Sequence, residues 1–143
     1  MVSFNSVMYP FTAEDAMKKE VRHFIGKLKP QDRNLELKVI LVKVLGNFET
    51  RSHQQITQYL VADSSGSILC NYFGDIGKKM RAGDIVYMDG AYTTIFDGHM
   101  ILYLGKKGTI YKIGRFFMSF KELPRMSDKK FEQKSSDSAI ALS

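Results

Sequence analysis

The chain has very little cysteine and no long apolar run. Cys70 is the only cysteine among 143 residues, which excludes an internal disulfide and a zinc site with several cysteine ligands. No apolar stretch approaches the roughly twenty residues that a membrane-spanning helix needs. Residues 1–16 also lack the basic start and apolar segment of a secretion signal. We therefore expect a soluble protein in a reducing, intracellular compartment.

Residues suited to catalysis or metal binding are also few. None of the three histidines stands at a metal-ligand spacing, since they are widely separated as His23, His53 and His99. Asp84 and Asp89 are five residues apart on a predicted strand, which places them on opposite faces unless a bulge intervenes. Cys70 fits a small core residue better than a nucleophile, because it alternates with apolar neighbours. We expect no enzyme, no catalytic residue, no metal and no cofactor.

Positive charge is concentrated in the middle of the chain. The net charge is +6, and residues 28–116 hold twelve basic and eight acidic side chains, which is +4 of that total. An anionic partner is therefore expected to contact this segment. The alternative is that the surplus only maintains solubility.

Residues 12–28 carry a helical pattern. Apolar side chains recur at spacings of three and four, at Ala13, Met17, Val21, Phe24, Ile25 and Leu28. Thr12 is a suitable N-cap, and Pro30 marks the latest end of the helix. We assign residues 1–27 to an N-terminal arm and amphipathic helix, and expect the helix to pack on the following domain or on a partner.

Five segments have the composition and alternation of β-strands: 35–50, 55–62, 68–73, 85–95 and 99–104. Turn signals lie at 63–66 and at Asp97-Gly98, residues 75–84 have room for one or two helical turns, and Gly90 suits a bulge. This order predicts an all-β protein, a five-stranded OB-fold Greek-key barrel with an added N-terminal helix. Alternation alone would also permit an SH3-like barrel. The barrel domain is placed at 28–124, with a short segment at 109–113, and residues 125–143 are expected to form a disordered polar tail.

Aromatic side chains recur on the polar side of the predicted strands, which suggests a ligand with flat faces. The candidates for contact with such a ligand are Phe73, Tyr92, Phe96 and Tyr103. The candidates for a cationic track along the phosphates are Arg51 and His53 in the first loop, Lys78, Lys79 and Arg81 after the third strand, and Lys106 and Lys107 after the fifth. Ordinary sheet packing is the alternative for the two tyrosines, capping of the barrel for Phe96, and a solvated turn for residues 78–81.

The barrel segment contains a series of short motifs in a fixed order: Lys29-Pro30, Asn34-Leu35, Val61-Ala62-Asp63, Gly66-Ser67-Ile68, Asp75-Ile76-Gly77, Gly83-Asp84-Ile85, Leu102-Tyr103 with Gly105, Lys112-Ile113-Gly114 and Glu122-Leu123-Pro124. In these motifs the chain resembles the SOSS-B family, simple OB-fold proteins that bind single-stranded DNA within the SOSS complex. The resemblance implies single-stranded DNA binding in the DNA damage response and DNA repair. It also implies a nuclear protein docked on an Integrator-subunit scaffold, with the four aromatic candidates as its base-stacking residues.

The chain departs from that family at several positions. Phe73 stands where members carry tryptophan, and Gly90 and Asp97 stand where they carry lysine. The Gly-Glu-Phe that follows the barrel in the family is Gly114-Arg115-Phe116 here, so Arg115, Phe116 and Phe117 are only weak candidates for the partner contact. An RNA-binding OB module and an OB-fold protein-interaction module remain alternative functions.

Overall fold

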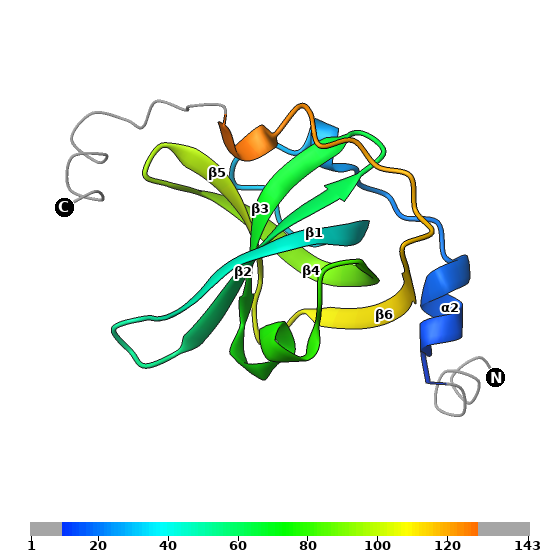
Figure 1. The fold of residues 1–143 in the computed structure, drawn as a ribbon, viewed down its shortest axis with the longest axis horizontal. Helices are drawn as coiled ribbons and strands as arrows, with labels where there is room; N and C mark the ends of the chain where they lie inside the picture. The colour runs from blue at the N-terminus through cyan, green and yellow to red at the C-terminus, as the bar shows by residue number, and fades with distance from the viewer. Residues whose placement is uncertain (1–9, 129–143) are drawn as a thin grey trace.

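The computed structural model describes residues 10–128, and this segment is built around six β-strands (Figure 1). The strands are β1 (Leu35–Glu49), β2 (Gln55–Asp63), β3 (Gly66–Phe73), β4 (Asp84–Phe96), β5 (His99–Leu104) and β6 (Thr109–Arg115). Within residues 10–128 the α-helix α2 (Ala13–Lys18) precedes them, and the 3-10 helices are η1 (Ile25–Lys27), η2 (Gly74–Lys79) and η3 (Met126–Asp128). No helix within residues 10–128 has the length and apolar character to cross a membrane.

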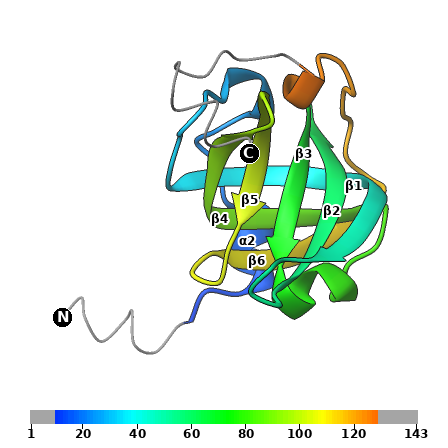
Figure 2. The ribbon, with the colours of Figure 1, turned by 90° about the vertical axis from the view of Figure 1, so that its left-hand side faces the viewer.

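The first five strands pair in a closed ring. The sheet order is β1-β2-β3-β5-β4-β6, and an additional pairing of β1 with β4 closes the ring. Only the β3–β5 pair is parallel among the described pairs. Figure 2 shows β2, β3, β5 and β4 side by side on one side of the molecule. This arrangement agrees with the predicted OB-fold topology.

The prediction of five strands was wrong, because the sheet has six. The segment predicted at 109–113 pairs with β4 as β6. β4 can take this extra strand because it is thirteen residues long. One of its edges pairs with β1, while its other edge pairs first with β6 and then with β5. The switch occurs at Gly90, whose φ of 85° marks the predicted bulge.

Strand alternation correctly separates the core from the outer face. Ile68, Cys70 and Tyr72 are fully buried, while Phe73 on the opposite parity is partly exposed. The predicted hairpin at Asp97-Gly98 is also confirmed, with φ values of 54° and 81° that fit a tight two-residue turn. The predicted helical turns before β4 form η2.

The thiol of Cys70 should be unreactive in the folded protein. Burial raises the pKa of its thiol to about 12, so at pH 8 only about one thiol in ten thousand is ionised. We predict that a thiol-disulfide reagent such as DTNB leaves the native protein unmodified for hours and titrates one thiol in urea. Rapid modification without denaturant would contradict this placement of Cys70.

The predicted helix over 12–28 is too long. Thr12 caps α2 as expected, with Asp15 completing the capping box, but the helix ends at Lys18. The chain then runs extended because polar groups of the barrel bind it: Asp63 Oδ2 accepts the Ile25 N–H at 2.9 Å, and His23 Nδ1 accepts the Glu36 N–H at 3.0 Å.

The N-terminal segment is therefore part of the domain. Ile25 and Leu28 lie in the main core, and Ala16 is fully buried in a smaller cluster with Ile85 and Tyr87. The prediction that the helix packs on the barrel is confirmed. The boundary drawn at residue 27 is corrected accordingly, and residues 1–9 of the predicted arm lie outside the described residues.

The C-terminal boundary at 125 also needs correction. Ser127 is 2% exposed, and its hydroxyl joins two strands, since it accepts the Leu69 N–H at 2.9 Å and donates to the Met100 carbonyl at 2.6 Å. His99 Nδ1 lies 2.6 Å from the Ser127 carbonyl oxygen. Residues 125–128 thus belong to the folded domain. The rest of the predicted tail, 129–143, lies outside the described residues.

Candidate nucleic-acid interface

Three of the four predicted aromatic residues form one continuous stack on the outer face. The rings of Tyr92 and Tyr103 lie 5.4 Å apart between centroids and within 9° of parallel. The Phe73 ring lies 5.9 Å from that of Tyr103, at 26°. All three side chains are partly exposed. The stack presents flat apolar surface to solvent, which is the surface on which a nucleobase can stack.

The strand register explains why these rings meet. Tyr92 on β4 is directly opposite Tyr103 on β5, and Tyr103 pairs in the parallel direction with Asn71 on β3. Directly opposite side chains share one face of a sheet at close range. Phe73 follows Asn71 by two residues on the same face, so its ring reaches Tyr103 diagonally. Three segments that are distant in sequence thus supply one aromatic row.

The two tyrosines remain neutral at physiological pH. Burial raises the pKa of the Tyr92 hydroxyl, and burial together with the neighbouring Tyr92 raises the pKa of Tyr103. The aromatic row therefore carries no negative charge that would repel a phosphate. Beside it, Asn71 accepts a 2.8 Å hydrogen bond from the Gln58 side chain, so the adjoining surface is polar and held in place.

Phe96 stands apart from this stack. It is 69% exposed at the tip of the β4–β5 hairpin. This exposure argues against the alternative that its ring caps the barrel. Its place at the edge of the same outer face leaves it available to a ligand that runs past the hairpin.

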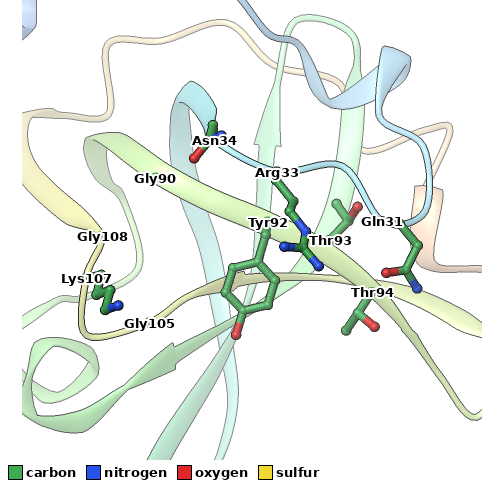
Figure 3. Close-up of a pocket in the computed structure, with 10 residues that line it drawn as sticks. All are labelled: Gln31, Arg33, Asn34, Gly90, Tyr92, Thr93, Thr94, Gly105, Lys107 and Gly108. Carbon is green, nitrogen blue, oxygen red and sulfur yellow. The ribbon is translucent and has the colours of Figure 1, made fainter.

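An open groove of about 500 Å³ adjoins Tyr92 (Figure 3). Its lining includes Arg33 and Gln31 from the segment before β1, Thr94 from β4, and Lys107 from the β5–β6 turn. In Figure 3 the Arg33 and Lys107 side chains lie on either side of the Tyr92 ring. The groove thus combines a stacking surface with two cations and several neutral polar groups.

Arg33 and Gln31 were not among the predicted site residues. They reach the groove because Thr93 fastens their loop to β4: its hydroxyl donates to the Lys29 carbonyl at 2.6 Å, and its N–H donates to the Asp32 carbonyl at 3.0 Å. Nothing in the local pattern of residues 29–34 indicates this contact. The pairing of β1 with β4 is what brings the loop there.

The seven predicted basic residues do not form one continuous track. Lys107 lines the groove, and Lys106 is exposed beside it. Lys78 and Arg81 instead line a separate hollow beneath η2, and Lys79 is exposed on that helix. Arg51 and His53 lie exposed at the turn between β1 and β2, where His53 Nδ1 is 3.5 Å from Glu49.

The weakly predicted partner residues lie where β6 ends. Arg115 donates from Nε to the buried Asp84 at 2.8 Å, and its guanidinium lies 4.5 Å over the Phe116 ring. Burial raises the pKa of Asp84, but the Arg81 N–H, Arg115 and Lys112 together outweigh burial and lower it. Phe116 and Phe117 remain 68% and 66% exposed. Arg115 therefore holds its own strand in place, while the two phenylalanines are open.

Neutralising Asp97 should strengthen binding to a polyanion. Asp97 is exposed beside Phe96, so its carboxylate repels phosphates near the hairpin. Asparagine tolerates the left-handed φ of 54° at this position. We predict that Asp97→Asn raises the affinity for oligo-dT about two- to threefold at low salt. Asp75→Asn, on the exposed side of η2, is the matched control. Equal affinities of Asp97→Asn and wild type by fluorescence anisotropy would contradict the expectation.

Comparison with known proteins identifies the family. The family model described as single-stranded DNA binding protein Ssb-like, OB fold, matches residues 28–112. The single-stranded DNA binding protein Ssb of Saccharolobus solfataricus is 30% identical over 92 residues, which cover 60% of each of the two chains. The chain therefore spans about three fifths of that relative's length.

Two solved structures share the fold. The solution structure of a hypothetical protein from Arabidopsis thaliana has a TM-score of 0.66 at 23% identity, covering 83% of this chain and 91% of that one. The solution structure of a replication factor A related protein from Methanobacterium thermoautotrophicum has a TM-score of 0.52 at 21% identity, covering 66% and 94%. Since the family model spans more than half of the chain, this protein belongs to the Ssb-like family of OB-fold single-stranded-DNA-binding proteins.

Proposed function

We propose that this protein binds single-stranded DNA without strong sequence preference, by stacking bases on the row formed by Phe73, Tyr103 and Tyr92. The observation that supports the proposal is the continuous contact of the three rings on an open face. Every base has a flat face, so stacking on such a row tolerates any sequence. Each stacked base contributes about 1 to 3 kcal/mol to binding, so the row is expected to dominate the affinity.

The cations beside the row are proposed to hold the phosphates. Arg33 and Lys107 lie on either side of Tyr92, where a backbone that leaves the stack would pass. Contacts with phosphates release counterions and make the affinity fall as salt rises. Lys78, Lys79 and Arg81 are not needed for this path. Lys78 and Arg81 line a different hollow, and Lys79 lies on η2.

Fluorescence anisotropy with three labelled ligands at two salt concentrations tests the proposal. We expect oligo-dT to bind more tightly than duplex DNA of equal length, with a loss of affinity at the higher salt. Tighter binding to single-stranded RNA would instead favour the RNA-binding alternative, since contacts with the 2′-hydroxyl separate the two. Equal binding to all three ligands, or no binding, would contradict base stacking.

A role as a SOSS-B-like component in DNA damage response and repair is the finer proposal. It rests on the resemblance of residues 24–124 to that family, and it includes nuclear localisation, an Integrator-subunit scaffold as partner and no enzymatic activity. Arg115 is engaged with Asp84, so a scaffold would contact mainly Phe116 and Phe117. Co-precipitation of the scaffold by wild type and its loss with Phe117→Ser would support the dock. Absence of any co-precipitation of the scaffold by wild type would contradict this proposed contact.

A further inference from the structure

The hairpin of β1 and β2 extends beyond the closed ring and carries an aromatic residue that the proposed function does not use. Figure 1 shows this hairpin projecting from the body of the molecule. Phe48 lies near its tip and is 46% exposed. A single exposed ring needs no explanation by itself, so a role for Phe48 has to be argued from its position. Its position relative to the aromatic row indicates what that role is.

Strand pairing places Phe48 on the same face as the aromatic row. Phe48 is directly opposite Ile56 on β2, and Ile56 is directly opposite Phe73 on β3. Opposed residues share one face of a sheet, so the three side chains form one line across the strands. Ile56 is only 5% exposed, as expected for a side chain between two rings.

The neighbouring residues on the hairpin support this orientation. Asn47, which precedes Phe48, accepts a 2.7 Å hydrogen bond from the Thr57 hydroxyl. Asn47, Thr57 and Val44 line the hollow beneath η2, on the opposite side of the hairpin. Successive side chains on a strand point to opposite faces, so Phe48 points away from η2 and toward the face that carries Phe73.

The distances suit a single ligand. Neighbouring strands lie about 4.8 Å apart, so the backbones of Phe48 and Phe73 are roughly 10 Å apart, and the path from β4 to β1 spans about 19 Å. At a spacing of about 3.4 Å or more per nucleotide, such a path takes at most about six nucleotides. This falls within the range of site sizes that one OB fold covers. Arg51 at the tip of the hairpin adds a cation at the far end.

We infer that Phe48 is a further base-stacking residue, and that it extends the single-stranded DNA site from the aromatic row onto the β1–β2 hairpin. The inference rests on the proposed function. It assigns the outer face of the hairpin to nucleotides that lie beyond the three-ring row. Long strands then gain from Phe48, and strands too short to reach past Phe73 do not.

The first test compares two lengths of oligo-dT by anisotropy. Phe48→Leu retains an apolar side chain over Ile56 but removes the ring. We expect it to weaken binding of an oligo-dT of about twelve nucleotides at least fivefold, and to change binding of one of about four nucleotides less than twofold. Val44→Ala is the matched control, because Val44 is 51% exposed on the opposite face of the same hairpin. An unchanged melting temperature of Phe48→Leu shows that the fold is intact.

The second test uses the absence of tryptophan from the chain. Phe48→Trp introduces a single tryptophan, whose fluorescence should be quenched on addition of the longer oligo-dT if a base stacks on it. Val44→Trp should not respond. The inference is overturned if Phe48→Leu binds with wild-type affinity and the fluorescence of Phe48→Trp is not quenched. In that case, weak binding by Tyr103→Ala would show that the proposed function still stands. Failure of wild type to bind oligo-dT overturns both.

Discussion

Tyr103→Ala is expected to weaken oligo-dT binding by about tenfold or more. Tyr103 is the middle ring of the row and contacts both Tyr92 and Phe73, so its loss removes one stacking surface and the support of the other two. A stacked base contributes about 1 to 3 kcal/mol, which corresponds to roughly five- to 150-fold in affinity. Phe73→Ala, at the end of the row, is expected to cost less. Equilibrium anisotropy titrations measure both effects.

Two control variants separate stacking from other effects. Tyr103→Phe keeps the ring and removes the hydroxyl, so its affinity should stay within about twofold of wild type. Tyr111→Ala removes a tyrosine that packs against Phe11 and Tyr87, away from the aromatic row, and should leave binding unchanged. Wild-type affinity of Tyr103→Ala in a protein with an unchanged circular dichroism spectrum would rule out base stacking on this row.

Glu36→Gln is expected to lower the free energy of unfolding by about 2 to 3 kcal/mol at pH 7. Glu36 is 1% exposed, forms ion pairs with Lys19 and Arg22, and accepts a hydrogen bond from the Tyr87 hydroxyl. Burial raises its pKa, but Lys19, Tyr87 and Arg22 outweigh burial and lower the pKa from 4.5 to about 2. Glutamine has the same size but cannot carry the charge that these donors require. Urea denaturation measures the difference.

The lowered pKa of Glu36 makes the free energy of unfolding depend on pH. Because the folded-state pKa lies below the unfolded value, the carboxylate stabilises the protein fully above pH 4.5, and this contribution is lost as the pH falls toward 2. The difference in stability between wild type and Glu36→Gln should therefore shrink steadily from pH 5 to pH 2. Glu14→Gln, whose side chain is 75% exposed, should show no such trend. A pH-independent difference for Glu36→Gln would mean that packing, and not charge, is responsible.

Much of the fold follows from the sequence because alternation and turn chemistry are local. A few neighbouring residues are enough to predict three of its features. These are the burial of alternate residues Ile68, Cys70 and Tyr72, the bulge at Gly90 and the turn at Asp97. The helix was overestimated for the same reason. The apolar spacing over 12–28 is real, but the contacts that pull residues 20–25 into an extended path come from Glu36 and Asp63, and local sequence does not contain them.

The site was predicted in part. The alternation of side chains along β3 identifies the face on which Phe73 lies. The position of Arg33 in the groove depends instead on the pairing of β1 with β4, which sequence order does not specify. The orientation of Phe48 depends on two register shifts in β1, between Leu41 and Lys43 and between Val44 and Gly46, since each shift alters the alternation. Gly90 adopts a φ of 85°, a conformation that lysine rarely takes. A lysine at position 90 would therefore be strained in this chain, and Arg33 and Lys107 supply the charge beside Tyr92.

The closed ring also governs how the chain folds. The pair that closes it joins Leu35 to Ala91, and β3 must find β5 in parallel register, so the chain loses entropy before these distant contacts form. Proteins rich in such non-local pairs fold in milliseconds to seconds, more slowly than helical bundles of the same size. The backbone amides that join β1 to β4 and β3 to β5 should therefore exchange with solvent only through global unfolding, whereas those at the tip of the β1–β2 hairpin should exchange by local opening.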